Sequence, residues 1–334
     1  MAGEDVCESV RRGGLLTQDR SVLVMLSGGR DSVCLLDVAV ALRTPAPIGA
    51  LHVNYGLREQ ADADERHCVA LCDRLGVELE VVRERRPEPP AGRAMGAAAG
   101  APASAPAPGN LQAWAREVRY REAERIARRN DALVATGHTA SDQVETILYR
   151  LAASPGRRAL LGMVASEGRL VRPLLTVTRQ QTTAYCEARG LPWREDCSNE
   201  DQRYARTRVR HGLLEALRAV HPAAQANVLR TAELLRAETQ LLDALVDEEL
   251  AGAGSIAIKR LEQLPAALAR MVVVRLAEDA AGTYVPQAGQ RVQELIELGR
   301  RRGRSELHVG GQAGAVVEDG VLHMVKLPPR TKAR

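Results

Sequence analysis

This sequence has few aromatic side chains and very few lysines. Phenylalanine is absent, and aromatic residues make up only 2% of the 334 residues. Leucine, valine and alanine must therefore fill the hydrophobic cores. Lysine occurs only at Lys259, Lys326 and Lys332, so nearly all the positive charge is arginine. The formal net charge of +4 is a weak indication of a polyanionic partner.

The sequence also lacks the marks of secreted and membrane proteins. No stretch approaches the roughly 18 uncharged apolar residues of a membrane span. The acidic start, Met1-Ala2-Gly3-Glu4-Asp5, has no apolar signal-peptide core. Its 6 cysteines are spread without the density of a disulfide scaffold. These features predict a cytoplasmic protein with no membrane partner.

Apolar segments alternate with helical patterns through the first half of the chain. Strands are expected over residues 22–26, 48–54, 77–82 and 132–136, and helices over 32–43, 61–75 and 111–129. This alternation predicts an α/β fold with a doubly wound, mostly parallel sheet. In such sheets ligands bind outside the carboxyl ends of the strands.

The chain is long enough for about two domains. We predict an N-terminal domain over residues 1–221, a helical linker over 222–254 and a smaller C-terminal α/β domain over 255–330. The break at His221-Pro222 ends a basic helix and precedes a leucine-rich helix over 224–250. Residues 86–109 are rich in Pro, Ala and Gly, which predicts a disordered surface insertion.

The hexapeptide Ser27-Gly28-Gly29-Arg30-Asp31-Ser32 lies between a strand pattern and a helix pattern. A glycine turn at that place presents backbone N–H groups and the positive end of a helix to one spot, which suits a phosphate. The segment is not a Walker A motif, because no lysine follows its second glycine, and it is not G-x-G-x-x-G. The alternative is an ordinary strand-to-helix turn.

A second polar segment, residues 137–146, follows the strand expected at 132–136. If Asp142 and Glu145 lie in the first turns of a helix, their spacing puts both carboxylates on one face. Such a pair can bind a substrate ammonium group. The alternative is helix-start capping, because acidic side chains favour the positive end of the helix dipole.

A third segment, residues 198–211, gathers arginines around Tyr204. Arg206 and Arg210 are four residues apart, so on a helix they share a face that can grip phosphates. A nucleic-acid backbone is one candidate ligand. Arg116, on the expected helix over 111–129, would by itself be read as part of a solvated face.

Taken together, these segments resemble the tRNA(Ile)-lysidine synthetases, a family of PP-loop ATP pyrophosphatases with an adenine nucleotide alpha hydrolase-like fold. The hexapeptide matches the S-G-G-x-D-S signature of the PP-loop. The other matching segments, in the family's order, are residues 52–58, 115–120, 137–146, 172–175 and 196–210. The resemblance is to the short forms with one small C-terminal domain.

The resemblance implies an ATP-dependent ligase that joins lysine to C2 of the wobble cytidine of a CAU-anticodon tRNA(Ile). An adenylated cytidine would be the intermediate, and AMP and pyrophosphate would be released. The implied cofactors are ATP and Mg²⁺, and the implied partners are tRNA(Ile) and free L-lysine. The small C-terminal domain would bind tRNA, and a homodimer is left open.

The resemblance also assigns roles to individual residues. The ATP phosphates would contact Ser27, Gly28, Gly29, Arg30, Asp31 and Ser32, with Asp31 also on Mg²⁺. His52, Asn54 and Arg116 would lie around the adenosine. Asp142 and Glu145 would orient the lysine, and Arg206 or Arg208 would stabilise phosphoryl charge or contact the tRNA.

Two positions depart from the family pattern, and other functions stay open. Ser141 stands where an aspartate is usual, and Tyr55 replaces a common histidine. Because Asp142 and Glu145 are present, we expect a tuned site that is still active. A PP-loop tRNA thiolase would need reactive cysteines, whereas Cys68 and Cys72 lie in a helical pattern that predicts buried packing. A noncatalytic ATP-binding regulator is the other alternative.

Overall fold

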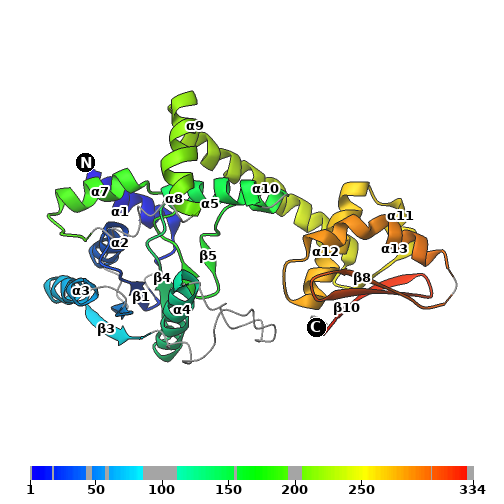
Figure 1. The fold of residues 1–334 in the computed structure, drawn as a ribbon, viewed down its shortest axis with the longest axis horizontal. Coiled ribbons are helices and arrows are strands. Elements are labelled where there is room, and N and C mark those ends of the chain that lie inside the picture. Colours follow the sequence, from blue (N-terminus) through cyan, green and yellow to red (C-terminus); the bar gives the residue numbers. More distant parts are fainter. Residues whose placement is uncertain are drawn as a thin grey trace, which may run out of the picture. The chain divides into compact units, whose positions relative to one another are not determined.

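The chain forms two compact units, shown in the computed structural model of Figure 1. The structure describes residues 2–16, 19–42, 47–56, 60–85, 111–153, 156–194, 205–301 and 303–328. The first unit ends at Glu233 and the second begins at Leu234, inside the long helix α10 (Ala224–Leu250). The disordered insertion predicted at 86–109 lies outside the described residues, and the three-part domain division stays a prediction.

The first unit is built on a six-stranded sheet with the strand order β3-β2-β1-β4-β6-β5. All neighbouring strands are parallel except β5 and β6, so the predicted doubly wound, mostly parallel sheet is confirmed. Its strands are β1 (Val22–Met25), β2 (Ile48–Asn54), β3 (Glu78–Arg83), β4 (Leu133–Ala135), β5 (Ser166–Glu167) and β6 (Leu170–Val171).

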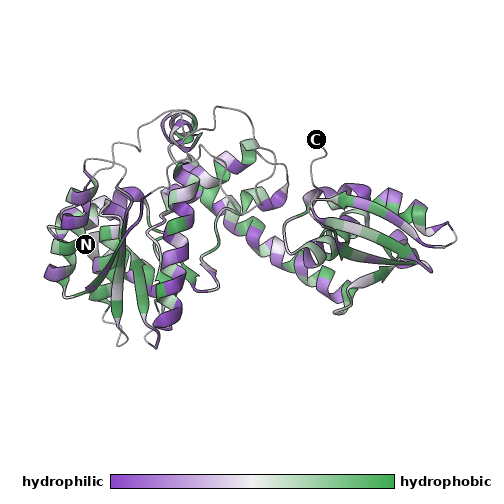
Figure 2. Cartoon of the chain, turned by 60° about the horizontal axis from the view of Figure 1, so that its bottom comes forward, coloured by the Kyte–Doolittle hydropathy of each residue, from purple (hydrophilic) through white to green (hydrophobic). Residues whose placement is uncertain are grey.

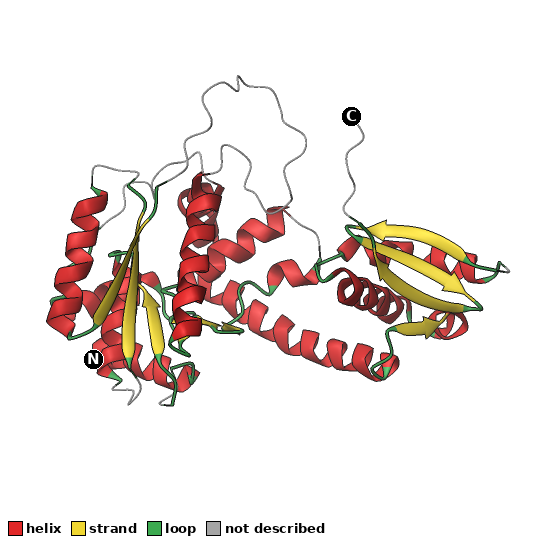
Figure 3. Ribbon diagram, turned by 90° about the horizontal axis from the view of Figure 1, so that it is seen from below, coloured by secondary structure: helices red, strands yellow, loops and turns green. Residues whose placement is uncertain are grey.

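Helices cover both faces of this sheet (Figure 3). Those of the first unit are α1 (Ala2–Gly13), α2 (Arg30–Ala41), α3 (Ala61–Leu75), α4 (Leu111–Arg129), α5 (Ala140–Ala153), α6 (Arg157–Leu160), α7 (Arg179–Ala188), α8 (Ala205–Arg208) and α9 (Leu214–Val220). A π-helical turn, Val209–Leu213, joins α8 to α9. Among the described residues, no helix is long and apolar enough to span a membrane.

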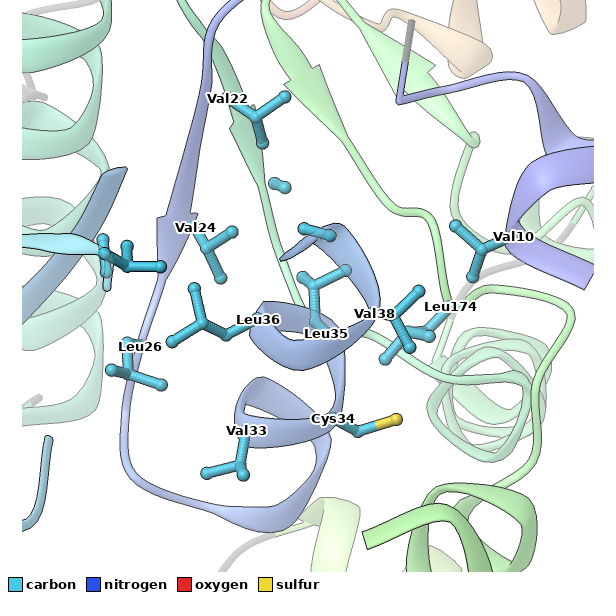
Figure 4. Packing of buried hydrophobic residues seen from close by; sticks show 14 of the residues in the cluster. Val10, Val22, Val24, Leu26, Val33, Cys34, Leu35, Leu36, Val38 and Leu174 are labelled. Atoms are coloured by element: carbon cyan, nitrogen blue, oxygen red, sulfur yellow. The ribbon is translucent and has the colours of Figure 1, made fainter. Parts of the chain in front are cut away.

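The continuous apolar run of β1 is explained by burial on both faces of the sheet. Val22 and Val24 pack with α2 on one face (Figure 4), whereas Leu23 and Met25 pack with α4 on the other. Successive side chains of a strand point to opposite faces, so a strand covered on both sides must be apolar throughout. Figure 2 shows this hydrophobic character along the central strands.

Helices α1, α6 and α7 of the first unit were not predicted from the sequence. Helix α1 begins in the acidic N-terminal segment but buries Val6 and Val10 in the main core. Helix α7 begins with a capping box, in which Thr178 accepts from the backbone of Gln181 and the Gln181 side chain accepts from the backbone of Thr178. That T-x-x-Q pattern is readable in the sequence.

The second unit packs helices against a four-stranded antiparallel sheet with the order β7-β10-β9-β8. Its strands are β7 (Ser255–Ala257), β8 (Ser305–Gly310), β9 (Ala313–Glu318) and β10 (Val321–Lys326). Its helices are α11 (Ile258–Gln263), α12 (Ala266–Ala281) and α13 (Val292–Gly299), with a 3₁₀ segment at Pro286–Arg291. The C-terminal part is therefore α/β in composition, as expected.

A buried carboxylate fastens α7 to α2. Asp37 of α2 is 2% exposed. The Tyr185 hydroxyl donates to its Oδ2 at 2.7 Å, and Nε of Arg189 donates to the same oxygen at 3.0 Å. Burial, followed by the hydrogen bond to Asp37, raises the pKa of Tyr185. The phenol therefore stays protonated and keeps donating to the carboxylate.

We expect Tyr185→Phe to lower the free energy of unfolding of the first unit by about 1–3 kcal/mol, because it removes one donor from a buried carboxylate while keeping the ring. Trp114 and Trp193 both lie in the first unit, so urea unfolding followed by tryptophan fluorescence reports on that unit. Tyr149→Phe, on the exposed side of α5, is the control. Equal unfolding midpoints for the two variants would contradict this expectation.

Candidate active site

The glycine turn between β1 and α2 leaves a helix N-terminus free of side-chain capping. Gly29 is the N-cap residue of α2 and makes no side-chain cap hydrogen bond. The first amide groups of a helix have no partner within the helix, so here they are available to an anion. Gly28 has φ +83°, and a Cβ at that position would lie 3.3 Å from Sγ of Cys68. The turn therefore requires glycine.

Two serine hydroxyls hold the turn in shape. Oγ of Ser27 lies 3.1 Å from Oγ of Ser32 and accepts from the Gly29 amide at 3.3 Å. Oγ of Ser32 donates to the Gly29 carbonyl oxygen at 2.8 Å. Both hydroxyls thus lie at the mouth of the predicted phosphate site.

The loop after β4 packs directly on the first turn of α2. A Cβ at Gly137 would lie 3.0 Å from the backbone carbon and oxygen of Asp31 and 3.1 Å from the Ser32 amide. Backbone atoms cannot give way as a flexible side chain can, so only glycine fits. The close approach brings the segment that starts at Gly137 against the hexapeptide.

Asp142 combines the two interpretations that its sequence position allowed. Its Oδ2 accepts from the backbone amide and from the hydroxyl of Thr139, both at 2.8 Å, as in helix capping. Its Oδ1 faces Nη2 of Arg179 at 3.0 Å. One carboxylate oxygen therefore caps α5, and the other faces a cation.

Glu145 is a buried carboxylate held by two guanidinium groups. It is 2% exposed. Arg210 donates to both of its oxygens, at 2.6 and 3.1 Å, and Nη1 of Arg179 lies 3.3 Å from Oε1. Because Asp142 and Glu145 share Arg179 as a partner, they lie on one face of α5, as their spacing predicts.

Helix α7 supplies two site residues that sequence analysis missed. Nε of Arg179 lies 3.8 Å from Oδ2 of Asp31, so its guanidinium reaches all three carboxylates of the site. The Thr182 hydroxyl donates to Oδ1 of Asp31 at 2.5 Å, and Nε of Arg30 lies 3.3 Å from the same oxygen. The capping box at Thr178 could have predicted the start of α7 from the sequence. It gives no indication that Arg179 or Thr182 contacts the carboxylates of the site.

Within the basic run, the arginine that contacts the carboxylates is not one of the two expected to act on phosphoryl groups or tRNA. Arg210 contacts Glu145, whereas Arg206 and Arg208 are exposed on α8. The sequence indicated Arg210 only as a residue on the same helix face as Arg206. Roles for Arg206 and Arg208 in phosphoryl or tRNA contact stay predictions.

Ser141 stands where the resemblance predicts an aspartate, and its contacts are structural. Its Oγ accepts from the backbone amide of Arg179 and from Nε2 of Gln225, both at 3.2 Å. The serine thus fastens the start of α7 and the first turn of α10 to α5. The hydrogen bond from the Arg179 amide holds the backbone of Arg179 against α5, and the serine adds no charge to the site.

Two residues expected near the adenosine are buried and already hydrogen-bonded within the protein. Nδ1 of His52 lies 2.9 Å from the Leu26 carbonyl oxygen. Nδ2 of Asn54 donates to Glu65 at 2.8 Å and to Asp62 at 3.0 Å. Both lie at the carboxyl end of β2, and their contact with adenosine stays a prediction.

Tyr55 is anchored to the start of α4. Its hydroxyl donates to the Ala115 carbonyl oxygen at 2.8 Å, and its ring meets Trp114 edge-on with centroids 5.6 Å apart. Burial raises the pKa of Tyr55. Where the family commonly has histidine, this chain therefore has a neutral aromatic group that packs α4 against the loop after β2.

Arg116 lines an open cavity of about 440 Å³. The other lining residues are Ala113, Glu117, Tyr120, Glu167, Leu170 and Arg172. The Arg116 guanidinium lies 4.7 Å from the Tyr120 ring centroid, which is cation–π geometry. Arg172 is 6% exposed, and its Nε has no hydrogen-bond partner among the described residues.

His138 lies in a basic environment beside this cavity. Burial lowers its pKa to about 4, and the nearby charges of Arg172, Arg116 and Arg206 act in the same direction against the opposing effect of Asp142. The imidazole is therefore neutral near pH 7. Its Nδ1 lies 2.8 Å from Oγ1 of Thr136.

The described cysteines are buried or partly buried free thiols. Burial raises the pKa of Cys68 to about 12 and that of Cys72 to about 11, so both stay protonated and poorly nucleophilic. Across the described ranges, no group of three or more His, Cys, Asp or Glu side chains could hold a metal ion. Cys197 lies outside those ranges.

Comparison with known proteins gives a consistent family. Residues 6–217 match the family model of the PP-loop domain. A tRNA(Ile)-lysidine synthase from Pseudomonas fluorescens is 37% identical over 68% of this chain and 48% of its own length. One from Solibacter usitatus is 36% identical over 86% of this chain and 63% of its own. One from Gloeobacter violaceus is 36% identical over 78% of both.

The chain thus spans about half to two thirds of the first two relatives. Among solved structures, the tRNA thiolase NcsA of Methanococcus maripaludis, solved with its 4Fe-4S cluster, aligns with a TM-score of 0.55 and 18% identity. The alignment covers 70% of this chain and 78% of that chain. That likeness supports the fold alone. The family model and the sequence relatives together show that the chain belongs to the tRNA(Ile)-lysidine synthase family of PP-loop proteins.

Proposed function

We propose that this chain joins lysine to C2 of the wobble cytidine of a CAU-anticodon tRNA(Ile), with conversion of ATP to AMP and pyrophosphate. The observation that carries the proposal is the meeting of Asp142 and Glu145 with Asp31, all three through the guanidinium of Arg179. Amine-binding carboxylates thereby adjoin a phosphate-binding turn. The names of the sequence relatives support the same substrates.

The phosphates of ATP would bind at the uncapped N-terminus of α2. Amides of residues 28–31 and the hydroxyls of Ser27 and Ser32 would contact the β- and γ-phosphates. Asp31 would hold Mg²⁺ as a single protein carboxylate, which suits an ion that usually keeps waters and phosphate oxygens as its other ligands. When bound, the ion would neutralise charge on the leaving pyrophosphate.

In the first chemical step, O2 of the cytosine would attack the α-phosphate. The new O–P bond replaces the bond to pyrophosphate, and AMP is left attached at C2. The arginines near His138 and the cavity of Arg116 would favour the developing negative charge. Positioning and electrostatic stabilisation supply most of the rate in such a transfer.

In the second step, the ε-amine of lysine would attack C2 and displace AMP. A lysine ammonium must first lose a proton, because only the neutral amine has a free electron pair. Asp142 and Glu145 would orient the ammonium group and accept that proton. A new C–N bond forms as the C–O bond to AMP breaks.

The tRNA would lie on the arginine-rich side of the first unit and on the second unit. Arg206 and Arg208 are exposed on α8 and can pair with backbone phosphates. The second unit would contact the tRNA outside the anticodon. A homodimer stays a prediction from the resemblance alone.

A tRNA thiolase remains the less favoured function. The likeness to NcsA is one of fold, at 18% identity. Thiolation needs reactive sulfur, whereas burial keeps Cys68 and Cys72 as thiols. The carboxylate pair on α5 has a use in amine ligation and none in sulfur transfer.

We expect the protein to transfer labelled lysine to tRNA(Ile) bearing a CAU anticodon, in a reaction that requires ATP and releases AMP. The assay incubates protein, labelled lysine, ATP and tRNA transcript, and counts label in precipitated tRNA. The same transcript with a UAU anticodon is the control, because it lacks the wobble cytidine. Absence of label under conditions where an established family member is active would overturn the proposed function.

Asp31→Ala should abolish lysine transfer, because the phosphates would lose their metal-bearing carboxylate. The exposed carboxylate of α3 gives a matched control, Asp73→Ala, which should keep wild-type activity. Tryptophan fluorescence during urea unfolding checks that both variants are folded. Activity retained by folded Asp31→Ala would remove Asp31 from the site.

Glu145→Gln should raise the KM for lysine by about tenfold or more while leaving the KM for ATP nearly unchanged, because it removes one charged partner of the ammonium group. The amide keeps the size of the side chain. Glu124→Gln is the control, because the Glu124 side chain is 43% exposed and pairs with Arg128 of the same helix. An unchanged KM for lysine would refute the ammonium-binding role of Glu145.

A further inference from the structure

The site contains a cation of its own at the place where the substrate amine is expected. The Arg179 guanidinium directs Nη2 to Asp142 at 3.0 Å, Nη1 to Glu145 at 3.3 Å and Nε to Asp31 at 3.8 Å. Its side chain is 25% exposed. Arg179 is therefore both accessible and surrounded by the carboxylates that an ammonium group would need.

With Arg179 in place, the carboxylates have little left to offer a second cation. Oδ2 of Asp142 is used by Thr139, and Glu145 receives Arg210 on both oxygens. The contacts of Arg30, Arg179 and Arg210 balance the charges of the three carboxylates one for one. A lysine entering this arrangement would add an uncompensated positive charge.

Arg179 is the partner held least firmly. Arg210 makes a two-point pair with Glu145, whose shorter distance is 2.6 Å. The nitrogens of Arg179 are divided among three carboxylates at 3.0 to 3.8 Å. Arg179 is also the first residue of α7, and a cation in the first turn of a helix is opposed by the helix dipole. Of the two arginines on Glu145, Arg179 is thus the one that can leave.

An alternative partner for Arg179 would arrive with the nucleotide. Arg179 already reaches Asp31 in the first turn of α2, where the phosphates are proposed to bind. Guanidinium groups form strong two-point pairs with phosphates. Release of Arg179 to a phosphate would leave the carboxylates with one excess negative charge, which matches one ammonium group.

We propose that Arg179 closes the lysine site in the nucleotide-free protein, and that ATP opens it by drawing the guanidinium onto its phosphates. This inference rests on the proposed function and adds an order to it: ATP binding creates the high-affinity site for lysine. The exchange couples the two substrates through one side chain. Ser141 and the Thr178 capping box keep the start of α7 in place while the side chain moves.

The test measures lysine affinity by isothermal titration calorimetry on the full chain, with and without α,β-methylene-ATP. This analogue keeps the phosphate charges but cannot release pyrophosphate. In the wild type the analogue should tighten lysine binding by about tenfold or more. In Arg179→Gln, lysine should bind with the same affinity with and without the analogue, within about twofold, because no internal cation has to leave.

Two further variants make the result specific to Arg179. Arg179→Lys keeps a cation but cannot contact three carboxylates through separate nitrogens. Its coupling between lysine and the analogue should therefore lie between those of the wild type and Arg179→Gln. It replaces the glutamine variant in the test if that variant does not fold. Arg275→Gln is the matched control, because that side chain is 28% exposed and pairs with one carboxylate in the second unit. It should show wild-type coupling.

The outcomes separate this inference from the proposed function. The proposed exchange of Arg179 is overturned if Arg179→Gln shows the same coupling between lysine and the analogue as the wild type. It is also overturned if the analogue does not change the lysine affinity of the wild type. Both results count against it even if lysine is transferred to tRNA. By linkage, lysine must tighten binding of the analogue by the same factor in the wild type and leave it unchanged in Arg179→Gln. Failure of lysine to bind under any condition, together with no transfer to tRNA, rejects the proposed function and the exchange with it.

Discussion

The arrangement of the site depends on a balanced set of partly buried ion pairs at the N-termini of three helices. Asp31 and Asp142 lie in the first turns of α2 and α5, and Arg179 is the first residue of α7. Carboxylates are favoured at a helix N-terminus and a guanidinium group is disfavoured there, so Arg179 is stable only because the carboxylates surround it. Removal of one partner from such a cluster leaves an uncompensated charge of low accessibility.

Two glycines allow the segments around these ion pairs to approach one another closely. Gly28 lets the turn pass against Cys68, and Gly137 lets the loop after β4 lie on the backbone of Asp31. A side chain at Gly137 would hold the loop that leads into α5 away from the first turn of α2. The parallel sheet supplies the framework, since β1 and β4 are neighbours and their carboxyl ends deliver both loops to one edge.

The two sides of the site differ in charge, and the difference fits a reaction between a nucleotide base, a phosphate and an amine. Asp31, Asp142 and Glu145 form the carboxylate side, where Arg30, Arg179 and Arg210 balance their charges. His138 is kept neutral by burial and by Arg172, Arg116 and Arg206, which form the basic side. In the proposed function, the amine would bind at the carboxylates, and the arginines near His138 would stabilise negative charge on the transferring phosphoryl group.

The sequence by itself determined strands β1 to β4, the helices α2, α3 and α4 and the turn at the hexapeptide, because these depend on local signals, whereas β5 and β6 were not predicted. Val22 to Met25 are apolar without interruption, which is required of a strand buried on both faces, and glycines mark the turn that follows. The spacing of Asp142 and Glu145 was also enough to put them on one helix face. The resemblance carried over a longer list of residues, of which His52 and Asn54 are engaged within the protein itself.

Only the tertiary structure decided which cations meet those carboxylates. Arg179 and Thr182 are 37 or more residues from Asp142 and Asp31, and no periodicity links them. Among the arginines of the basic run, Arg210 reaches Glu145 from the π-helical turn Val209–Leu213, whereas Arg206 and Arg208 are exposed on α8. Ion pairs between distant segments depend on how the helices pack, and packing is a property of the whole fold.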